Sequence, residues 1–247
     1  MLIRSDEHVD LPTPFGSMRT HLFRPVAGRH PGILLFSEIF QVTGPIRRAA
    51  ALLAGHGYLV SVPEIFHELE GEPGVVLSYD DEGARRGNAH KVTKTLASYD
   101  TDARVALDHL AAHPECTGRL GVMGICVGGH LALRAALQPD VAAAACFYAT
   151  DLHTHSLGQG ASDDTLARVS EASGELLMVW GRQDPHIPAE GRRRIQDALE
   201  EAGADFTWHE FNGQHAFLRD EGPRYDAELA RFGSDLVLSL FHRRLSA

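Results

Sequence analysis

The sequence contains only three cysteines, Cys116, Cys126 and Cys146. An odd and sparse set is atypical of a disulfide framework, so we expect the protein to work in a reducing cytoplasm. No spacing of cysteines and histidines is typical of a zinc site, and we expect neither a metal nor a cofactor. The first residues also lack the basic start and apolar stretch of a signal peptide.

Long apolar runs and an excess of positive charge are missing as well. No apolar segment reaches the roughly 20 residues that cross a bilayer, so we expect no membrane span. The chain has 23 Lys and Arg against 33 Asp and Glu, which gives a net charge of −10. Because such a chain repels polyanions, we expect a small molecule as its partner and no nucleic acid.

The 247 residues, 44% of them apolar, suit one large α/β domain over 1–247. Strand-like segments alternate with helical ones, which predicts a mostly parallel sheet with helices on both faces. Residues 64–88 fit neither pattern; they are either a solvated excursion or a segment over the mouth of a site. Strands are expected at 3–11, 18–23, 32–37, 58–62, 120–123, 141–148, 175–181 and 206–211, and helices at 45–56, 100–113, 127–137, 189–202 and 223–243.

The chain is organised around Gly-Ile-Cys-Val-Gly-Gly at 124–129, which lies between a strand-like and a helix-like stretch. This arrangement is typical of the nucleophile elbow of the α/β-hydrolase fold, with Cys126 where serine is usual. Gly124 and Gly128 leave room for the strained turn. A helix beginning at Val127 directs backbone N–H groups at the reacting atoms and favours thiolate over thiol. The alternative is a buried structural cysteine in a glycine-rich turn.

Two further candidates, Asp184 and His215, each follow a later predicted strand. Parallel-sheet enzymes build their sites at the carboxyl ends of strands, and the order nucleophile, acid, histidine is that of α/β-hydrolases. A free thiol, with a reference pKa of about 8.5, is mostly protonated near neutral pH. His215 can take its proton and return it to a leaving group, while Asp184 fixes the imidazole tautomer. The rival acids Asp163 and Asp164 lie in a long loop.

Two backbone N–H groups are expected to stabilise the oxyanion of a tetrahedral intermediate. One belongs to Val127, directly after the nucleophile. The other should come from the loop after the strand at 32–37, and we choose Ile39.

At this point the sequence resembles the dienelactone hydrolases, or carboxymethylenebutenolidases. The similar segments are the elbow at 124–129, Ser-Glu-Ile-Phe at 37–40, Pro-Glu-Ile-Phe at 63–66, the acid loop at 181–188 and His-Ala-Phe-Leu-Arg at 215–219. The resemblance covers nearly the whole chain. It implies a hydrolase that opens a lactone or cleaves another activated carboxylic ester through an acyl-cysteine intermediate, without a cofactor.

The resemblance also implies roles for residues outside the triad. Glu38 would contact the resting cysteine and help to deprotonate it when substrate binds. Arg219 and a second arginine would hold a substrate carboxylate. Spacing favours Arg86 as that second arginine, while a length difference leaves Arg85 open, and His90 stands where the family has a tyrosine.

Several other functions remain open from the sequence. The same triad could serve a broader esterase, a thioesterase or a phosphotriesterase. A non-catalytic α/β-hydrolase that binds a small carboxylate is a second possibility, and a redox sensor using Cys126 is a third. The complete triad argues against the binder, and the absence of a nearby resolving cysteine argues against the sensor. Either a monomer or a homodimer is compatible with these features.

Overall fold

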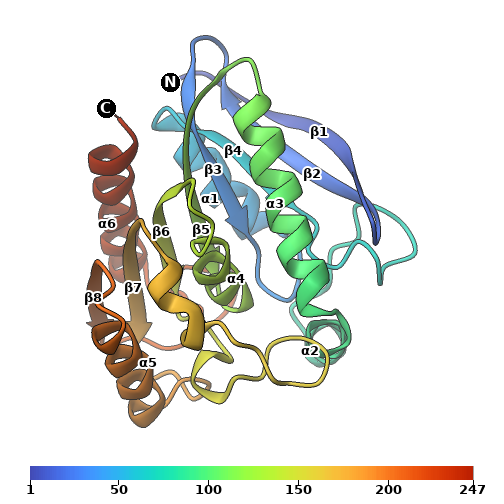
Figure 1. The fold of residues 1–247 in the computed structure, drawn as a ribbon. Helices are drawn as coiled ribbons and strands as arrows, with labels where there is room; N and C mark the ends of the chain where they lie inside the picture. The colour runs from blue at the N-terminus through green and yellow to red at the C-terminus, as the bar shows by residue number, and fades with distance from the viewer. Residues whose placement is uncertain (247) are drawn as a thin grey trace.

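The computed structural model describes residues 1–246 and contains an eight-stranded sheet in the order β1-β2-β4-β3-β5-β6-β7-β8 (Figure 1). β1 and β2 pair antiparallel, as do β2 and β4, and the remaining pairs are parallel. This is the mostly parallel sheet that the alternation of segments predicted. The strands are β1 (Ile3–Thr13), β2 (Gly16–Pro25), β3 (His30–Phe36), β4 (Leu59–Pro63), β5 (Cys116–Ile125), β6 (Val141–Phe147), β7 (Glu175–Gly181) and β8 (Phe206–Phe211).

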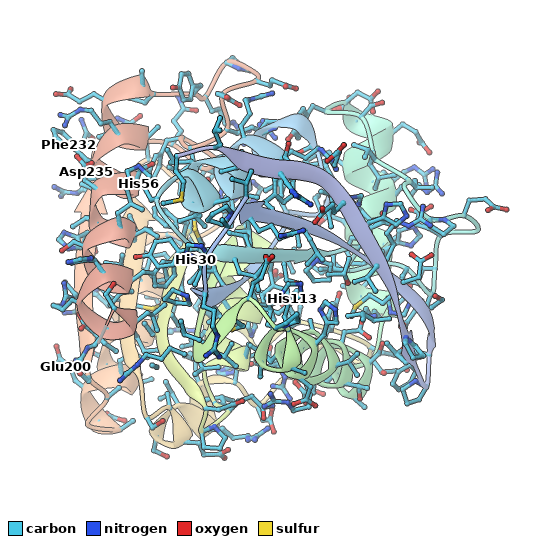
Figure 2. All side chains as sticks on the ribbon, turned by 90° about the horizontal axis from the view of Figure 1, so that it is seen from above. His30, His56, His113, Glu200, Phe232 and Asp235 are labelled. Atoms are coloured by element: carbon cyan, nitrogen blue, oxygen red, sulfur yellow. The ribbon has the colours of Figure 1, made fainter. Side chains whose placement is uncertain are left out.

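Helices cover both faces of this sheet. Figures 1 and 2 show α1 and α3 on opposite faces. The helices are α1 (Gly44–Gly55), α2 (Asp81–Thr93), α3 (Leu96–Ala112), α4 (Val127–Ala135), α5 (Ala189–Glu201) and α6 (Ala227–Leu245), with short 3₁₀ helices η1 (Leu152–Thr154) and η2 (Leu166–Glu171). No helix within residues 1–246 is both long and apolar enough to cross a bilayer.

The burial of the strands follows from this layering. Every residue of the inner strand β7 is buried, as expected for a parallel strand covered on both faces. The edge strands β1 and β8 consist mostly of exposed or half-buried residues. The continuous apolar runs in the sequence therefore mark the strands in the middle of the sheet.

The helix α2 is a feature that the sequence reading missed, because residues 64–88 were expected to have no regular pattern. Asp80 caps α2 by accepting a hydrogen bond of 2.8 Å from the backbone N–H of Gly83. Two glycines weaken the helical pattern, but both are needed for close packing. A Cβ at Gly83 would lie 2.0 Å from the carbonyl oxygen of Ser78, and one at Gly87 would lie 2.4 Å from that of Ile39.

Two other helices begin away from their predicted starts. α3 begins at Leu96 rather than near residue 100, because the side chain of Thr95 caps it by accepting from the N–H of Ser98. α6 begins at Ala227 rather than 223, where the Asp226 side chain accepts from two N–H groups of the first turn. In both cases a polar cap sets the boundary more precisely than apolar periodicity does.

The parallel strands β3, β5, β6, β7 and β8 all end at the same edge of the sheet. Polar and reactive side chains follow directly after these ends, as they do in other parallel-sheet proteins. This edge is where the candidate site is assembled.

Candidate active site

Cys126 lies in the sharp turn that joins β5 to α4, with φ of 62° and ψ of −122°. Non-glycine residues rarely adopt a positive φ, and such strain concentrates at functional sites. A Cβ at Gly124 would lie 1.8 Å from the carbonyl oxygen of Gly128, and a Cβ at Gly128 would lie 2.4 Å from that of Phe36. Close backbone contacts therefore require both glycines of the elbow.

The backbone of Cys126 is also held by the end of the neighbouring strand. Its N–H donates to the carbonyl oxygen of Phe147 at 3.1 Å, and its carbonyl oxygen accepts from the N–H of Thr150 at 3.3 Å. These two bonds fix the strained turn against the carboxyl end of β6.

His215 and Asp184 form a buried pair on the same edge. Nδ1 of His215 lies 2.6 Å from Oδ2 of Asp184, and the two side chains are 7% and 1% exposed. The other oxygen of Asp184 accepts from the backbone N–H of His186 at 2.8 Å. Because Nδ1 is bound to the carboxylate, Nε2 is the nitrogen left to bond with Cys126.

The environment of His215 favours its charged form. Burial alone lowers the pKa of His215, but the charge of Cys126 and hydrogen bonds to Asp184 and Cys126 raise it to about 10. An imidazolium at neutral pH beside the sulfur is the partner that stabilises a thiolate.

Cys126 and His215 open into a cavity of about 640 Å³. Its walls come from the loop after β3, from α2 and the residues before it, and from the loops after β6, β7 and β8. The polar and charged side chains on these walls include Glu38, Tyr79, Lys91, Asp151, His186, Arg219 and Arg224.

Glu38 is almost fully buried at the cavity wall, with 3% exposure. Its Oε1 accepts a hydrogen bond of 2.6 Å from the Tyr79 hydroxyl, which also lies 2.7 Å from Oγ1 of Thr43. Its Oε2 lies 3.8 Å from Arg219, whose guanidinium sits 4.3 Å over the ring of Tyr79. Burial raises the pKa of Glu38, while the Tyr79 hydrogen bond and the charge of Arg219 oppose that increase.

Three sequence-predicted binding residues lie on α2 but do not line this cavity. Arg85 is 71% exposed and pairs with Glu82 within the helix. Arg86 binds Glu70, and Nε2 of His90 lies 2.9 Å from the same carboxylate. These acidic partners hold the three side chains outside the cavity.

The residues of α2 that do line the cavity are Asp81, Ala84, Asn88 and Lys91. Their spacing of three, four and three residues is that of one helix face. Nζ of Lys91 lies 2.8 and 3.0 Å from the two carboxylate oxygens of Asp151. Neither Lys91 nor Tyr79 was identified from the sequence, although recognising the Asp80 cap would have given the face to which Lys91 belongs.

The two chosen oxyanion donors have N–H groups without a partner. Among the hydrogen bonds of residues 1–246, none is donated by the backbone N–H of Ile39 or Val127. Val127 is fully buried and Ile39 is 9% exposed. Ile39 lines the cavity and Val127 directly follows Cys126, which also lines it. Because buried N–H groups are nearly always bonded, two free ones at these positions are suited to an incoming oxygen.

The rival acids Asp163 and Asp164 do not line the cavity. Asp163 lies 3.3 Å from His130 in a buried contact, and Asp164 binds Arg134 at 2.6 Å. Both carboxylates therefore fasten the loop after β6 to α4.

A single group of three side chains within residues 1–246 has the proximity of metal ligands: His67, Glu68 and Asp102. The ammonium of Lys94 is fully buried among them, 2.7 Å from a carboxylate oxygen of both Glu68 and Asp102. Lys94 already supplies the positive charge that these carboxylates require.

Comparisons with known proteins agree with this architecture. The family model of the dienelactone hydrolases, "Dienelactone hydrolase family", matches residues 18–245. The chain is 39% identical to a Saccharomyces cerevisiae protein named "Putative carboxymethylenebutenolidase", over 99% of this chain and 93% of that protein. It is 25% identical to the "Carboxymethylenebutenolidase" of Pseudomonas sp. (strain P51), over 92% of this chain and 91% of that one.

Solved structures show the same fold. A "Putative Dienelactone Hydrolase" from Klebsiella pneumoniae superposes with a TM-score of 0.82 at 24% identity, covering 98% of this chain and all of that one. A "Dienelactone Hydrolase-like Promiscuous Phospotriesterase" from metagenomic libraries gives a TM-score of 0.77 at 19% identity, with 98% of each chain covered. At these sequence identities the structural similarity shows the α/β-hydrolase fold and nothing finer. This is the fold expected from the sequence.

Proposed function

The chain belongs to the dienelactone hydrolase family and is a carboxylic ester hydrolase, and we propose that it works through an acyl-cysteine intermediate on Cys126. The substrate is a small lactone or another activated ester. The observation that carries this proposal is the buried Asp184–His215 pair, 2.6 Å long, beside a cysteine with positive φ.

In the first step the sulfur of Cys126 attacks the carbonyl carbon. A C–S bond forms, and the π electrons of the carbonyl move to its oxygen. The free N–H groups of Ile39 and Val127 donate to that oxyanion, and losing one such donor costs about 3 kcal/mol. His215, charged at this stage, remains oriented by Asp184.

Collapse of the oxyanion breaks the bond to the alkoxy oxygen, and Nε2 of His215 gives its proton to that oxygen. In a lactone the new alcohol remains attached to the acyl group. A water molecule then attacks the thioester while neutral His215 accepts its proton. The C–S bond breaks, the carboxylic acid leaves, and the thiolate and imidazolium are restored.

Glu38 is proposed to tune the thiol. A carboxylate this deeply buried is costly unless it has a use. Its negative charge opposes the ionisation of Cys126, whereas the N-terminus of α4 favours it. The other role open to Glu38 is to hold the loop after β3, which carries the proposed oxyanion donor Ile39, through hydrogen bonds.

Arg219 is proposed to bind an anionic group of the substrate. It lines the cavity with 15% of its side chain exposed, and a new carboxylate could compete with Glu38 for its guanidinium. Lys91 and Arg224 are the other cations on the cavity wall. We propose Lys91, which a substrate carboxylate would have to share with Asp151, for the role on α2 that the sequence assigned to Arg85 or Arg86.

Assays of the purified protein on lactones, aryl esters, thioesters and phosphotriesters test this function. Hydrolysis of lactones or esters that is lost in Cys126→Ala supports it. Turnover of phosphotriesters alone would favour the alternative activity, and turnover of none of the four classes would favour a carboxylate-binding protein or a redox sensor.

A further inference from the structure

His153 lies on the boundary between two hollows in the surface. It belongs to η1, directly after β6, and lines the cavity that contains Cys126. It also lines a second hollow of about 670 Å³ between η2 and α5. One imidazole ring therefore separates the reactive cysteine from an unassigned space.

The second hollow has a partly apolar wall. Leu166 and Ala167 of η2 line it together with Ala198 of α5 and Ala202, which directly follows α5. Its charged members are Arg194, which pairs with Glu190 at 2.5 Å, and Glu201, whose carboxylate would repel an anion. Because the charge of Arg194 is already met, the space between the four apolar side chains suits a hydrocarbon chain better than an anion.

The ring of His153 rests on the bare backbone of α5. A Cβ at Gly191 would lie 2.6 Å from Cδ2 and 2.7 Å from Cγ of His153. The ring of His153 can therefore pack against α5 only because residue 191 has no side chain. Burial lowers the pKa of His153, which keeps the ring neutral near pH 7.

No hydrogen bond among residues 1–246 fastens this ring, and its buried Nδ1 has no partner there. Buried polar side-chain atoms are usually bonded, and a bonded ring would be fixed in place. A neutral ring without such a bond can change its rotamer at little electrostatic cost.

We propose that the hollow between η2 and α5 is a subsite for the unbranched hydrocarbon chain of an ester substrate, and that His153 is the gate that limits chain length. The proposal rests on the ester hydrolysis proposed above. His153 lines both the hollow and the cavity of Cys126, and the four alanine and leucine side chains supply the apolar surface of the hollow.

The test measures kcat/KM for p-nitrophenyl acetate, butyrate and octanoate, and for a matching series of alkyl acetates. His153→Ala removes the ring that lines both hollows, so we expect the octanoate-to-acetate ratio to rise by about tenfold, which corresponds to the burial of about two further CH₂ groups at about 0.8 kcal/mol each. If the long-to-short ratio of kcat/KM rises for the p-nitrophenyl esters, the subsite binds the acyl chain. If the ratio rises for the alkyl acetates, the subsite binds the alkoxy chain.

Two further variants distinguish a gating role of His153 from a general effect of the substitution on the protein. Ala198→Phe fills the second hollow, so adding it to His153→Ala should return the ratio to that of the wild type. His56, labelled in Figure 2, is exposed at the end of α1 and lines neither hollow, and His56→Ala should leave the ratio unchanged.

A ratio that His153→Ala does not change, or that Ala198→Phe does not restore, overturns the proposal while ester hydrolysis stands. Binding of sodium octanoate and sodium acetate to Cys126→Ala, with and without His153→Ala, tests the subsite without turnover. If no ester is hydrolysed but His153→Ala selectively tightens octanoate binding, the subsite stands as a binding site and the proposed hydrolysis falls. Equal affinities with and without His153→Ala overturn the subsite as well.

Discussion

The hydroxyl of Tyr79 lies 2.6 Å from Oε1 of Glu38 and donates a hydrogen bond to it across 41 residues of sequence. This contact ties the segment before α2 to the loop after β3, which also carries the proposed oxyanion donor Ile39. A donated hydrogen bond stabilises the charged form of a buried carboxylate. The hydrogen bond therefore holds Glu38 on the wall of the cavity that Cys126 also lines.

Glu38→Gln tests that electrostatic role because it keeps the shape of the side chain and removes its charge. If Glu38 tunes the thiol, alkylation of Cys126 by iodoacetamide should have its pH midpoint at a lower pH, while ester hydrolysis slows. The measurement is the pH dependence of the alkylation rate, with Glu82→Gln on the exposed face of α2 as the control. An unchanged alkylation profile combined with slower hydrolysis would make Glu38 a scaffold for the oxyanion loop.

Arg219→Ala should raise KM for an anionic lactone far more than for a neutral ester. A charge-assisted hydrogen bond contributes about 1.5–3 kcal/mol, which corresponds to at least a tenfold change. Lys91→Met is expected to act in the same direction, whereas Arg85→Ala is not, because Arg85 does not line the cavity. Equal effects of Arg219→Ala on the two substrates would make Arg219 a structural residue.

The raised pKa of His215 predicts how the acylation rate depends on pH under alkaline conditions. Its ordinary value is 6.5, and the surroundings described above bring it to about 10. The acylation rate should therefore be level from pH 8 to 9 and fall as pH rises through about 10, because the imidazolium proton for the leaving group is lost. Pre-steady-state release of the alcohol from an alkyl ester, whose alkoxide needs this proton in order to leave, measures this rate. A rate that rises steadily through pH 10 would contradict the charged resting histidine.

The same shift links pH to folding. A histidine with a raised pKa in the folded state adds stability that is complete below pH 6.5 and is lost as pH rises through about 10. His215→Gln should therefore reduce the dependence of the unfolding free energy on pH across this interval. Urea unfolding at several pH values provides the comparison.

Gly124→Ala tests the geometry of the elbow. The new Cβ would lie 1.8 Å from a backbone oxygen, so we expect the free energy of unfolding to fall by about 3 kcal/mol or more, with loss of hydrolysis. Gly55→Ala in the last turn of α1 is the matched control, because within residues 1–246 its Cβ would have no atom within 4 Å apart from its chain neighbours and the backbone of its own helix. Since alanine is the better helix former, the control should be as stable as the wild type or more so. Equal stability of both variants would show that the turn relaxes easily.

The strands, their order along the chain and the layers could be predicted because each inner strand is a short apolar run followed by polar residues. The positions of Cys126, Asp184 and His215 at one edge follow from that order, since parallel strands end together. Their catalytic roles stay predictions. The alternation of strand-like and helix-like segments was enough to predict the shared edge, and no side-chain contact had to be known.

The cavity wall could not be predicted in the same way. Gly83 and Gly87 lower the helical propensity of α2, and only the tertiary contacts that require them reveal why they are there. Because α2 was not recognised, there was no helix face on which to separate Lys91 from Arg85 and Arg86. Tyr79 was missed because its partner Glu38 lies on another segment, and sequence spacing says nothing about such a long-range hydrogen bond.

Cys126→Ala should lose nearly all turnover, a decrease of order 10⁶ by analogy with serine triads. Cys146 is a suitable control because it is fully buried in β6, where burial raises the pKa of its thiol and makes it a poor nucleophile. Cys146→Ala should keep the hydrolytic activity of the folded protein. A Cys126→Ala protein that retained more than a few per cent of activity would require a different nucleophile.

The most direct measurement is mass spectrometry of protein quenched in acid during turnover of an activated ester, followed by peptide mapping. The account predicts an acyl adduct on the peptide that contains Cys126, formed at least as fast as the steady-state rate and absent from Cys126→Ala. Turnover that proceeds with Cys126 unmodified at every time point, or with the acyl group on Cys116 or Cys146, would contradict it.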